Sequence, residues 1–277
     1  MKSRSALLLS ISIAVLVGSA WPVTALAAFQ PRLGTTTSFA VLAASAITNT
    51  GATTVNGDVG ISPDGASSVT GFPPGVINGA PHYADGVAVQ AKNDLVTAYN
   101  DAANQTPFVD KTGVDLGGQS LTPGTYHFSS SAQLTGPLTL NGFGTYVFQI
   151  GSTLTTASGS SVLLTNGAQA CGVFWQVTSS ATFGTTTSFQ GTVMALQSIT
   201  MNTGATLIGR ALARNAAVTL DANTITVPPA SCASLPTTGI PAGLLDGPPW
   251  QLILIGVCGA LGVVVLGSRV RARRRTA

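Results

Sequence analysis

The sequence contains no glutamate and has little charge of any kind. Its 277 residues include 12 Lys or Arg, 9 Asp and 2 His. Acid–base catalysis depends on such side chains, and no two Asp residues have a spacing typical of paired catalytic carboxylates. His82 and His127 lie 45 residues apart without ligand-like neighbours, so they indicate neither a catalytic nor a metal site. We therefore predict no enzyme, no metal and no cofactor, although a carboxylate pair that only folding brings together stays open.

The few basic residues are concentrated at the two ends of the chain. Between residues 28 and 234 there are five Lys or Arg and eight Asp, so this part is mildly acidic although the whole chain has a formal charge of +3. A protein without a basic patch cannot neutralise phosphates, which excludes nucleic acid as a partner. The same part contains 32 threonines, so hydroxyl and amide groups must supply most of its polar surface.

Residues 1–27 have the pattern of a secretory signal peptide. Lys2 and Arg4 form a basic start, and an apolar run follows from residue 6 to residue 17. Ala25 and Ala27 provide the small residues of a cleavage site. We expect this segment to be cleaved and the remainder to be exported; the alternative is an uncleaved membrane anchor.

The C-terminal end carries the parts of a cell-wall sorting signal. Residues 235–239 read Leu-Pro-Thr-Thr-Gly, which fits the Leu-Pro-x-Thr-Gly motif of Gram-positive surface proteins. The uncharged residues 250–268 are at the lower length limit of a transmembrane helix, and the basic tail 269–277 is expected to stay cytoplasmic. In this interpretation a sortase cleaves between Thr238 and Gly239 and joins the protein to peptidoglycan. The alternative is that the membrane segment alone holds it.

These end segments leave one exported domain, residues 28–232, which the linker 233–249 joins to the membrane segment. About 200 residues suffice for one sizeable core. The only cysteines of the domain are Cys171 and Cys232, because Cys258 lies in the predicted membrane segment. Outside the cytoplasm such a pair usually forms a disulfide, which contributes about 4 kcal/mol. The alternative is two free buried thiols.

The domain repeats a threonine-rich block. Gly-Thr-Thr-Thr-Ser-Phe occurs at residues 34–39 and 184–189, and a Thr-Gly-Ala-Thr step follows each copy, at residues 50–53 and 203–206. Repetition of this kind favours stacked β-structure. Short segments rich in β-branched and aromatic residues, separated by Gly, Asn and Ser, are predicted strands: residues 146–150, 161–164, 173–177 and 191–196.

One segment has a different period. Residues 83–105 carry apolar side chains at helical spacing, and Pro107 ends the run. We predict one amphipathic helix that lies along the β-structure. Its apolar stripe is expected to serve packing alone, through Val87, Ala91, Leu95, Ala98 and Ala102.

Several motifs of the domain together resemble the microbial ice-binding proteins of the DUF3494 type. The resemblance covers about residues 33–232, nearly the whole exported part. The segments that carry it are residues 38–43, 47–51, 56–60, 69–75, 91–99, 173–177, 209–213 and 218–225.

This resemblance implies a fold and a function. The implied fold is a mostly β, discontinuous right-handed β-helix of triangular cross-section, with one long α-helix packed alongside. Characterised members adsorb to ice through one flat β-face and slow crystal growth or recrystallisation. Threonine suits such a face, because its stiff side chain presents a methyl group and a hydroxyl together.

The resemblance also implies which residues bind ice. Strongly active members carry a Thr-Ala/Gly-x-Thr/Asn motif on the binding face, and the two Thr-Gly-Ala-Thr steps match it. The candidates are therefore Thr50, Thr53, Thr203 and Thr206, with Ser180, Thr182, Thr200 and Thr219 as further candidates whose face the sequence does not fix. The alternative is that these are ordinary exposed strand residues, because threonine is common in strands.

The second functional hypothesis is a cell-surface adhesin or glycan-binding module without ice activity. Sugar-binding sites usually expose Trp or Tyr, whereas Trp175 lies in an apolar run and is predicted to be in the core. This favours ice as the partner. We expect a monomer that is secreted and anchored to the cell wall or to the outer face of the plasma membrane.

Overall fold

The computed structural model of the protein describes residues 28–229. The predicted signal peptide, Cys232, the Leu-Pro-Thr-Thr-Gly motif, the predicted membrane segment and the basic tail all lie outside these residues. Within residues 28–229, no helix is both long enough and apolar enough to cross a membrane.

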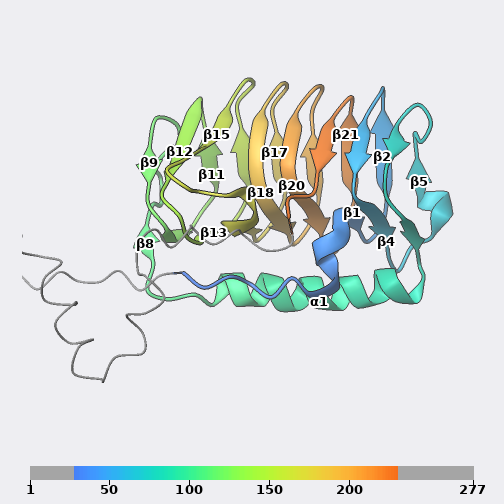
Figure 1. Ribbon diagram of the computed structural model, residues 1–277, viewed down its shortest axis with the longest axis horizontal. Helices are drawn as coiled ribbons and strands as arrows, with labels where there is room; N and C mark the ends of the chain where they lie inside the picture. Colours follow the sequence, from blue (N-terminus) through green and yellow to red (C-terminus); the bar gives the residue numbers. More distant parts are fainter. Residues whose placement is uncertain (1–27, 230–277) are drawn as a thin grey trace, which may run out of the picture. The chain divides into compact units, whose positions relative to one another are not determined.

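The described chain is mostly β-structure, wound into successive stacked coils with one long helix beside them (Figure 1). All the strand pairs are parallel, as expected when each coil places its strands directly beside those of the next coil. A 15-stranded sheet consists of β1 (Phe39–Ala43), β3 (Thr54–Asn56), β4 (Asp58–Ile61), β6 (Val76–Ile77), β7 (Pro81–Tyr83), β8 (Val109–Asp110), β9 (Ser120–Leu121), β10 (Gly124–Phe128), β12 (Pro137–Asn141), β13 (Tyr146–Ile150), β15 (Ser161–Thr165), β16 (Val173–Val177), β18 (Ser188–Ala195), β20 (Thr206–Ala213) and β22 (Thr224–Thr226).

A separate sheet of seven very short strands covers another side of the stack. It consists of β11 (Ala132–Leu134), β14 (Leu154–Thr156), β17 (Ala181–Phe183), β19 (Ile199–Met201), β21 (Val218–Asp221), β2 (Ile47–Thr50) and β5 (Val69–Thr70), in spatial order. Three short 3-10 helices complete the described elements: η1 (Gly34–Ser38), η2 (Ala66–Ser68) and η3 (Ala170–Gly172).

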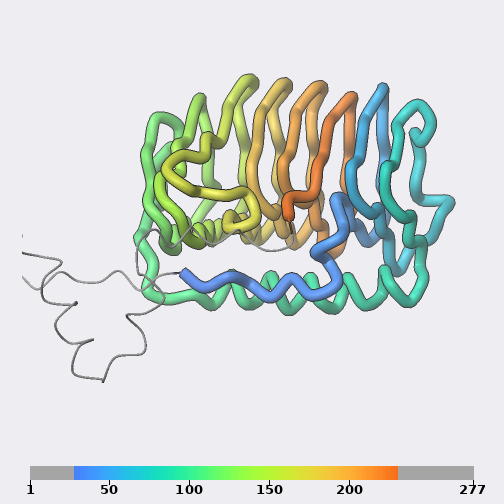
Figure 2. Tube along the Cα trace, in the orientation of Figure 1, coloured from blue at the N-terminus to red at the C-terminus, as the bar shows by residue number. Residues whose placement is uncertain are grey.

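The order of the coils in space differs from their order in sequence. The N-terminal strand β2 lies between β21, from the last described coil, and β5. Ile47 pairs with Val218, and in the larger sheet Val41 pairs with Ala211. Figure 2 shows the same relationship, with the N-terminal coil in blue beside the C-terminal coil in orange. The first coils are therefore held in place by contacts with residues more than 150 positions away.

Apolar side chains from successive coils fill the interior of the stack. Tyr126, Phe148 and Trp175 occupy register positions on adjacent strands, and their rings stack. The ring centroids of Phe148 and Trp175 are 3.9 Å apart and their planes differ by 8°. Trp175 is fully buried, as predicted, and its Nε1 donates a hydrogen bond to the carbonyl oxygen of Gln190 at 2.9 Å. Such pairs contribute about 0.5–1.5 kcal/mol beyond their buried area.

The helix predicted over residues 83–105 is present as α1 (Gly86–Ala103). It begins where the Asp85 carboxylate accepts a hydrogen bond from the amide of Ala88 at 2.8 Å, an N-cap that fixes its first turn. The prediction of Val87 as part of the buried stripe is wrong, because Val87 is 45% exposed and Ala88 is buried in its place. Helical side chains that are three or four residues apart lie on the same face. Ala88 lies three residues before Ala91 and therefore shares its face.

The buried stripe of α1 covers the larger sheet. Besides Ala88 it consists of Ala91, Leu95, Ala98, Tyr99 and Ala102, which cluster with Val147, Phe174, Met194 and Leu212. The N-terminal segment 28–33 runs along the same helix, where the Arg32 guanidinium pairs with the Asp101 carboxylate at 2.9 Å. Cys171 is disulfide-bonded. Its pairing with Cys232 stays a prediction, because Cys232 lies outside the described residues.

Candidate functional site

Each strand of the seven-stranded sheet contributes one outward side chain to a common row, in which the strand register aligns them. At the β11 end the row begins with Gln133. The six residues that follow are all threonines, all at least partly exposed, and we call them the threonine ladder: Thr155, Thr182, Thr200, Thr219, Thr48 and Thr70. Neighbours in such a row lie about 4.7–4.9 Å apart.

In β17, β19 and β21 the ladder residue stands in a local pattern of apolar, threonine, apolar. In β19, Ile199 and Met201 are 0% and 1% exposed, and Thr200 lies between them. Because side chains alternate along a strand, burial of both neighbours turns the threonine outward. The β-branched side chain has few rotamers, so its methyl group and hydroxyl are held in fixed positions. The pattern is similar in β17 and β21.

A second row of hydroxyl groups flanks part of the ladder. It is formed by Ser131, Thr153, Ser180 and Ser198, which lie two positions before Gln133, Thr155, Thr182 and Thr200, and an extended chain directs residues two apart to the same side. The hydroxyl of Thr153 donates to that of Ser131 at 2.9 Å, and the hydroxyl of Ser198 donates to that of Ser180 at 3.0 Å. These side chains link successive coils and widen the hydroxyl-bearing surface at the β11, β14, β17 and β19 end.

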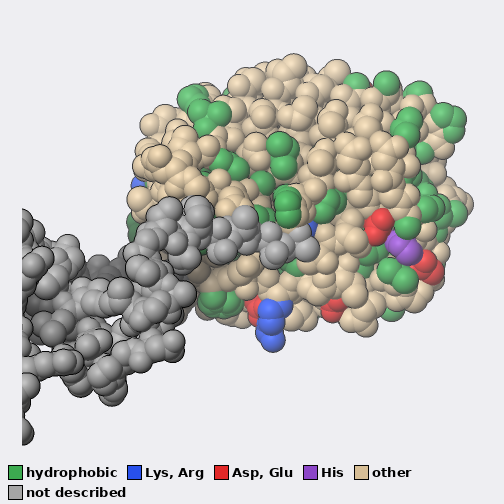
Figure 3. Space-filling model, in the orientation of Figure 1, with side chains coloured by type: hydrophobic (Ala, Val, Ile, Leu, Met, Phe, Trp, Pro, Cys, Tyr) green, Lys and Arg blue, Asp and Glu red, His purple; other side chains and the backbone are tan. Residues whose placement is uncertain are grey.

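Charge is almost absent from this surface. The seven strands contain a single charged residue, Asp221 at the end of β21. The hydroxyl of Thr203 donates a short hydrogen bond to the Asp221 carboxylate, which partly satisfies this charge. In the view of Figure 3, most of the charged side chains lie in the lower part of the molecule, where α1 runs in Figure 1. The ladder is therefore a neutral, regular, hydroxyl- and methyl-bearing surface.

The structure distributes the predicted site residues over several places. Thr182, Thr200 and Thr219 belong to the ladder, and Ser180 to the row beside it. Thr50 ends β2 at the rim of the same sheet, and Thr203 lies in the corner that follows β19. Thr206 begins β20 in the larger sheet, so its side chain belongs to a different face.

The two Thr-Gly-Ala-Thr steps are not structurally equivalent. In the second copy the step begins three residues after the ladder threonine Thr200, whereas in the first it begins two residues after Thr48. Thr206 pairs with Thr224 of β22, and Thr224 pairs with Thr54. The register therefore aligns Thr206 with Thr54 and not with Thr53. Thr53 is 0% exposed, and its hydroxyl accepts a hydrogen bond from the amide of Asn223 at 3.0 Å. A surface function therefore cannot include the Thr53 side chain.

Three ladder members, Thr48, Thr70 and Thr155, were not among the residues singled out by the sequence. Thr155 lies between the buried residues Leu154 and Thr156, but the apolar–threonine–apolar pattern does not mark it in the sequence because residue 156 is itself a threonine. Thr70 ends a two-residue strand, and only the strand pairing with Thr48 places it in the row.

A further row lies on the larger sheet and is less uniform; we call this side the second face. It contains Ser188, Thr206, Thr224 and Thr54 in register. Beside Thr206 and Thr224, the neighbouring row contains Ile208, which is 46% exposed. The mixture of aliphatic, amide and hydroxyl side chains makes this face less regular than the ladder.

Among residues 28–229, His, Cys and Asp side chains form no group of three or more that could hold a metal ion. The buried cations are used inside the fold. Arg210 is 1% exposed and donates to the carbonyl oxygen of Thr37 at 2.7 Å. Lys92 donates to the carbonyl oxygens of Ala213 and Arg214 at 2.7 and 2.5 Å. These bonds account for the charges of Arg210 and Lys92 without a ligand.

Comparisons with known proteins show which proteins this chain resembles. A protein named ice-binding protein from Nostoc sp. (strain HG1) is 51% identical over 221 residues, which cover 78% of this chain and 81% of that protein. The solved structure of an ice binding protein from an Antarctic biological consortium is 47% identical with a TM-score of 0.68, and the match covers 80% of this chain and 96% of that one.

The ice-binding protein of the Antarctic ascomycete Antarctomyces psychrotrophicus is 43% identical, with a TM-score of 0.70 and 72% and 99% of the two chains covered. The family model described as ice-binding-like matches residues 41–226, which include every strand from β2 to β22. The chain therefore belongs to the ice-binding-like family.

Proposed function

We propose that this protein binds ice, and that it adsorbs through the threonine ladder without catalysing a reaction. The observation that carries the proposal is the row of six in-register threonines on a surface with one charged residue at its edge. Family membership and the names of the relatives support ice as the partner.

The physical argument is a match of spacing and chemistry. Strand separations of about 4.7–4.9 Å along the ladder, and about 6.6 Å between same-side residues along a strand, resemble repeats of the ice lattice. The methyl groups favour ordered water next to them, and the hydroxyls bond to that water. Charged groups would orient water differently from ice. Each contact is weak, so adsorption depends on many threonines acting together.

We further propose the family's fold for the described coils: a discontinuous, right-handed β-helix of triangular cross-section. The strand order supports the discontinuity, because β2 lies next to β21. The three sides would be the ladder sheet, the second face and the side covered by α1.

We also propose that the protein acts outside the cell. The support comes from the signal-like residues 1–27 and from the sorting-like end of the chain, where a sortase would cleave between Thr238 and Gly239. Attached to the wall or membrane, an ice-binding surface would fix the cell to ice or protect its envelope. The expected Cys171–Cys232 disulfide is consistent with an exported protein.

The test is growth of ice crystals in the presence of the purified mature protein and of single Thr→Tyr variants. Arrested growth with faceted crystals is expected for the unchanged protein. Thr200→Tyr and Thr182→Tyr should lose this effect, because a bulky ring projects above the plane of the ladder. Thr97→Tyr is the matched control, since Thr97 is exposed on α1 and its hydroxyl makes only a 3.4 Å bond to the carbonyl oxygen of Asn93.

Thr224→Tyr places the same ring on the second face. Loss of activity in this variant alone would move the binding surface there and reject the ladder. Crystals that grow as round discs in the unchanged, folded protein would reject ice binding itself. In that case the surface adhesin is the remaining hypothesis.

A further inference from the structure

The row of side chains beside the threonine ladder continues over more coils than its hydroxyl groups do. Its register is fixed by main-chain hydrogen bonds, for example from the amide of Ala181 to the carbonyl oxygen of Ser198 at 3.0 Å and from the amide of Val218 to the carbonyl oxygen of Ala46 at 2.9 Å. Each member lies two positions before a residue of the row that contains the ladder, about 6.6 Å from it along the strand. Bonds of the same kind join six members, all at least partly exposed, which we call the flanking row: Ser131, Thr153, Ser180, Ser198, Ala217 and Ala46.

The hydroxyl members of the flanking row are linked in pairs across neighbouring coils. The bond from Thr153 to Ser131 measures 2.9 Å between the hydroxyl oxygens, and the bond from Ser198 to Ser180 measures 3.0 Å. A hydroxyl has one donor and two acceptor sites, so each pair keeps one proton and several lone pairs for water. Because each bond restricts two side chains, these water-binding groups are held at fixed positions before any ice is met.

A third pair is missing at the place where the register would put it. Ala217 and Ala46 are neighbours in the flanking row, as the members of the other two pairs are, but they carry no hydroxyl. The ladder itself continues there with Thr219 and Thr48, and Asp221 lies on the same strand as Thr219. The surface therefore has a two-row half on β11, β14, β17 and β19, and a one-row half on β21 and β2.

The second row changes what an ice crystal can match. One row of threonines repeats in a single direction, about every 4.7–4.9 Å, so it fits every crystal plane that contains such a repeat. A second row about 6.6 Å away adds a repeat across the first. Since two directions define a plane, the two-row half fits fewer crystal planes than the one-row half does. Its fixed hydroxyls also add contacts that a single row lacks.

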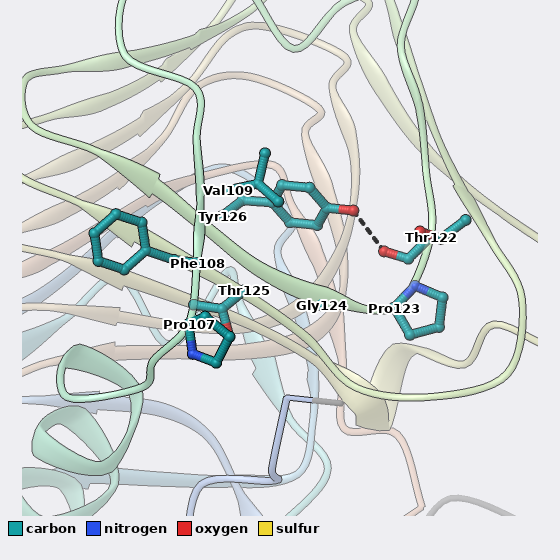
Figure 4. A pocket seen from close by; sticks show the side chains of 8 residues that line it. All are labelled: Pro107, Phe108, Val109, Thr122, Pro123, Gly124, Thr125 and Tyr126. Atoms are coloured by element: carbon teal, nitrogen blue, oxygen red, sulfur yellow. Dashed lines mark hydrogen bonds between the residues drawn. The ribbon is translucent and has the colours of Figure 1, made fainter. Parts of the chain in front are cut away.

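The apolar hollow at the β8 end of the molecule provides a comparison outside both rows (Figure 4). It has a volume of about 150 Å³ and is concave, so a flat crystal surface does not reach its walls. The hydroxyl of Tyr126 is not free for ice, because it donates to the carbonyl oxygen of Thr122 at 2.6 Å. Thr122 is exposed and lies beside this hollow, so its hydroxyl is a control position that belongs to neither row.

We propose, on the basis of the proposed ice binding, that the flanking row selects the ice plane. The hydroxyls of its two pairs bind a second line of water molecules in the crystal, parallel to the line bound by the ladder. The two-row half is the part of the surface that distinguishes one plane from another. Ala217 and Ala46 end this subsite.

The loss-of-function test removes one pair. Purified mature protein with a fluorescent label is adsorbed to a single ice crystal, which shows the planes that it binds, and the concentration that arrests growth is measured beside it. The unchanged protein should mark discrete planes. Ser180→Ala with Ser198→Ala should mark additional planes and need roughly 2- to 10-fold more protein for arrest, the effect of losing about one hydrogen bond. Thr122→Ala is the matched control and should behave as the unchanged protein.

The gain-of-function test supplies the missing pair. Ala46→Ser with Ala217→Ser should extend the two-row half over β21 and β2, keep the same planes, and lower the concentration for arrest at least about 2-fold. Ala103→Ser, at an exposed position at the end of α1, adds a hydroxyl elsewhere and should change neither result. Denaturant unfolding of each variant identifies any change that comes from loss of the fold.

Two results would overturn this role of the flanking row and leave the ladder in place. The first is an unchanged set of planes and an unchanged concentration for arrest in Ser180→Ala with Ser198→Ala, while Thr200→Tyr abolishes arrest. The second is the absence of any gain from Ala46→Ser with Ala217→Ser. If the unchanged protein does not arrest growth at all, both the plane selection and the proposed function are rejected.

Discussion

The hydroxyl of Thr48 donates to the hydroxyl of Thr219 at a distance of 3.4 Å, although 171 residues separate them in the chain. Both belong to the threonine ladder, on the adjacent strands β2 and β21. The ladder is therefore completed only when the N-terminal coil inserts beside the C-terminal one. An ice-binding surface that uses the whole row depends on this long-range pairing, and a locally folded fragment would lack it.

The methyl group and the hydroxyl of each ladder threonine should contribute unequally to the inhibition of ice growth. At Thr182, replacement by Val keeps the branched shape and loses the hydroxyl, whereas replacement by Ser keeps the hydroxyl and loses the methyl group and the stiffness of the side chain. We expect Thr182→Ser to lose more ice-growth inhibition than Thr182→Val. Both changes should alter the free energy of unfolding by less than about 0.5 kcal/mol, as is usual at exposed positions. Ice-growth assays beside denaturant unfolding check this, and equal losses would contradict it.

The sequence predicted the helix and many strands because their signals are local. The stripe of α1 repeats over 18 residues, and only its first member, Val87, was misplaced. The strand β16 was predicted at its observed bounds because four of its five residues are β-branched or aromatic. Such patterns need no information from distant parts of the chain.

The ladder could not be predicted in the same way. Each of these strands of two to four residues contributes one outward side chain to the row, and only the register shows that these side chains align. The repeated Thr-Gly-Ala-Thr step pointed to Thr53, which is buried, because one extra residue between Thr200 and Thr203 shifts the second copy. Thr70 enters the row solely through its pairing with Thr48.

The aromatic stack should carry much of the stability of the coils. Replacing Trp175 by Ala removes a fully buried ring from between Phe148 and Phe189. The free energy of unfolding should fall by about 3–5 kcal/mol, the range seen when large aromatic residues are truncated in a core. Denaturant unfolding measures this change. Phe143→Ala is the control, because Phe143 is 39% exposed. A similar loss of stability in that variant would contradict the assignment of the stability to the buried aromatic stack.

The pairing of Asp101 with Arg32 should make stability depend on acid pH. The hydrogen bond from the Arg32 side chain lowers the pKa of Asp101 below its usual value. In the unfolded chain the pKa of Asp101 is about 3.9, and above this pH the ion pair stabilises the fold fully. The stabilisation is lost as the pH falls through the lower pKa that Asp101 has in the folded protein. Thermal unfolding between pH 7 and pH 2 should show a smaller acid loss in Asp101→Asn than in the unchanged protein. Asp64→Asn is the control, and identical acid profiles for Asp101→Asn and the unchanged protein would refute the pairing.

Lys92 should produce the opposite dependence at alkaline pH. Burial lowers the pKa of Lys92 to about 8, and the charge of Arg214 acts in the same direction. The unfolded chain holds this proton up to a pKa of about 10.4, so the fold gains stability as the pH rises from 8 toward 10. The Lys92→Met variant should not show this gain in stability between pH 8 and 10. It also leaves the carbonyl oxygens of Ala213 and Arg214 without their donor, so the variant should be less stable than the unchanged protein at pH 7. Denaturant unfolding at pH 7, 8, 9 and 10 measures both effects, with Lys111→Met as the matched control. A Lys92→Met variant that gains stability between pH 8 and 10 as steeply as the unchanged protein would show that another group titrates there.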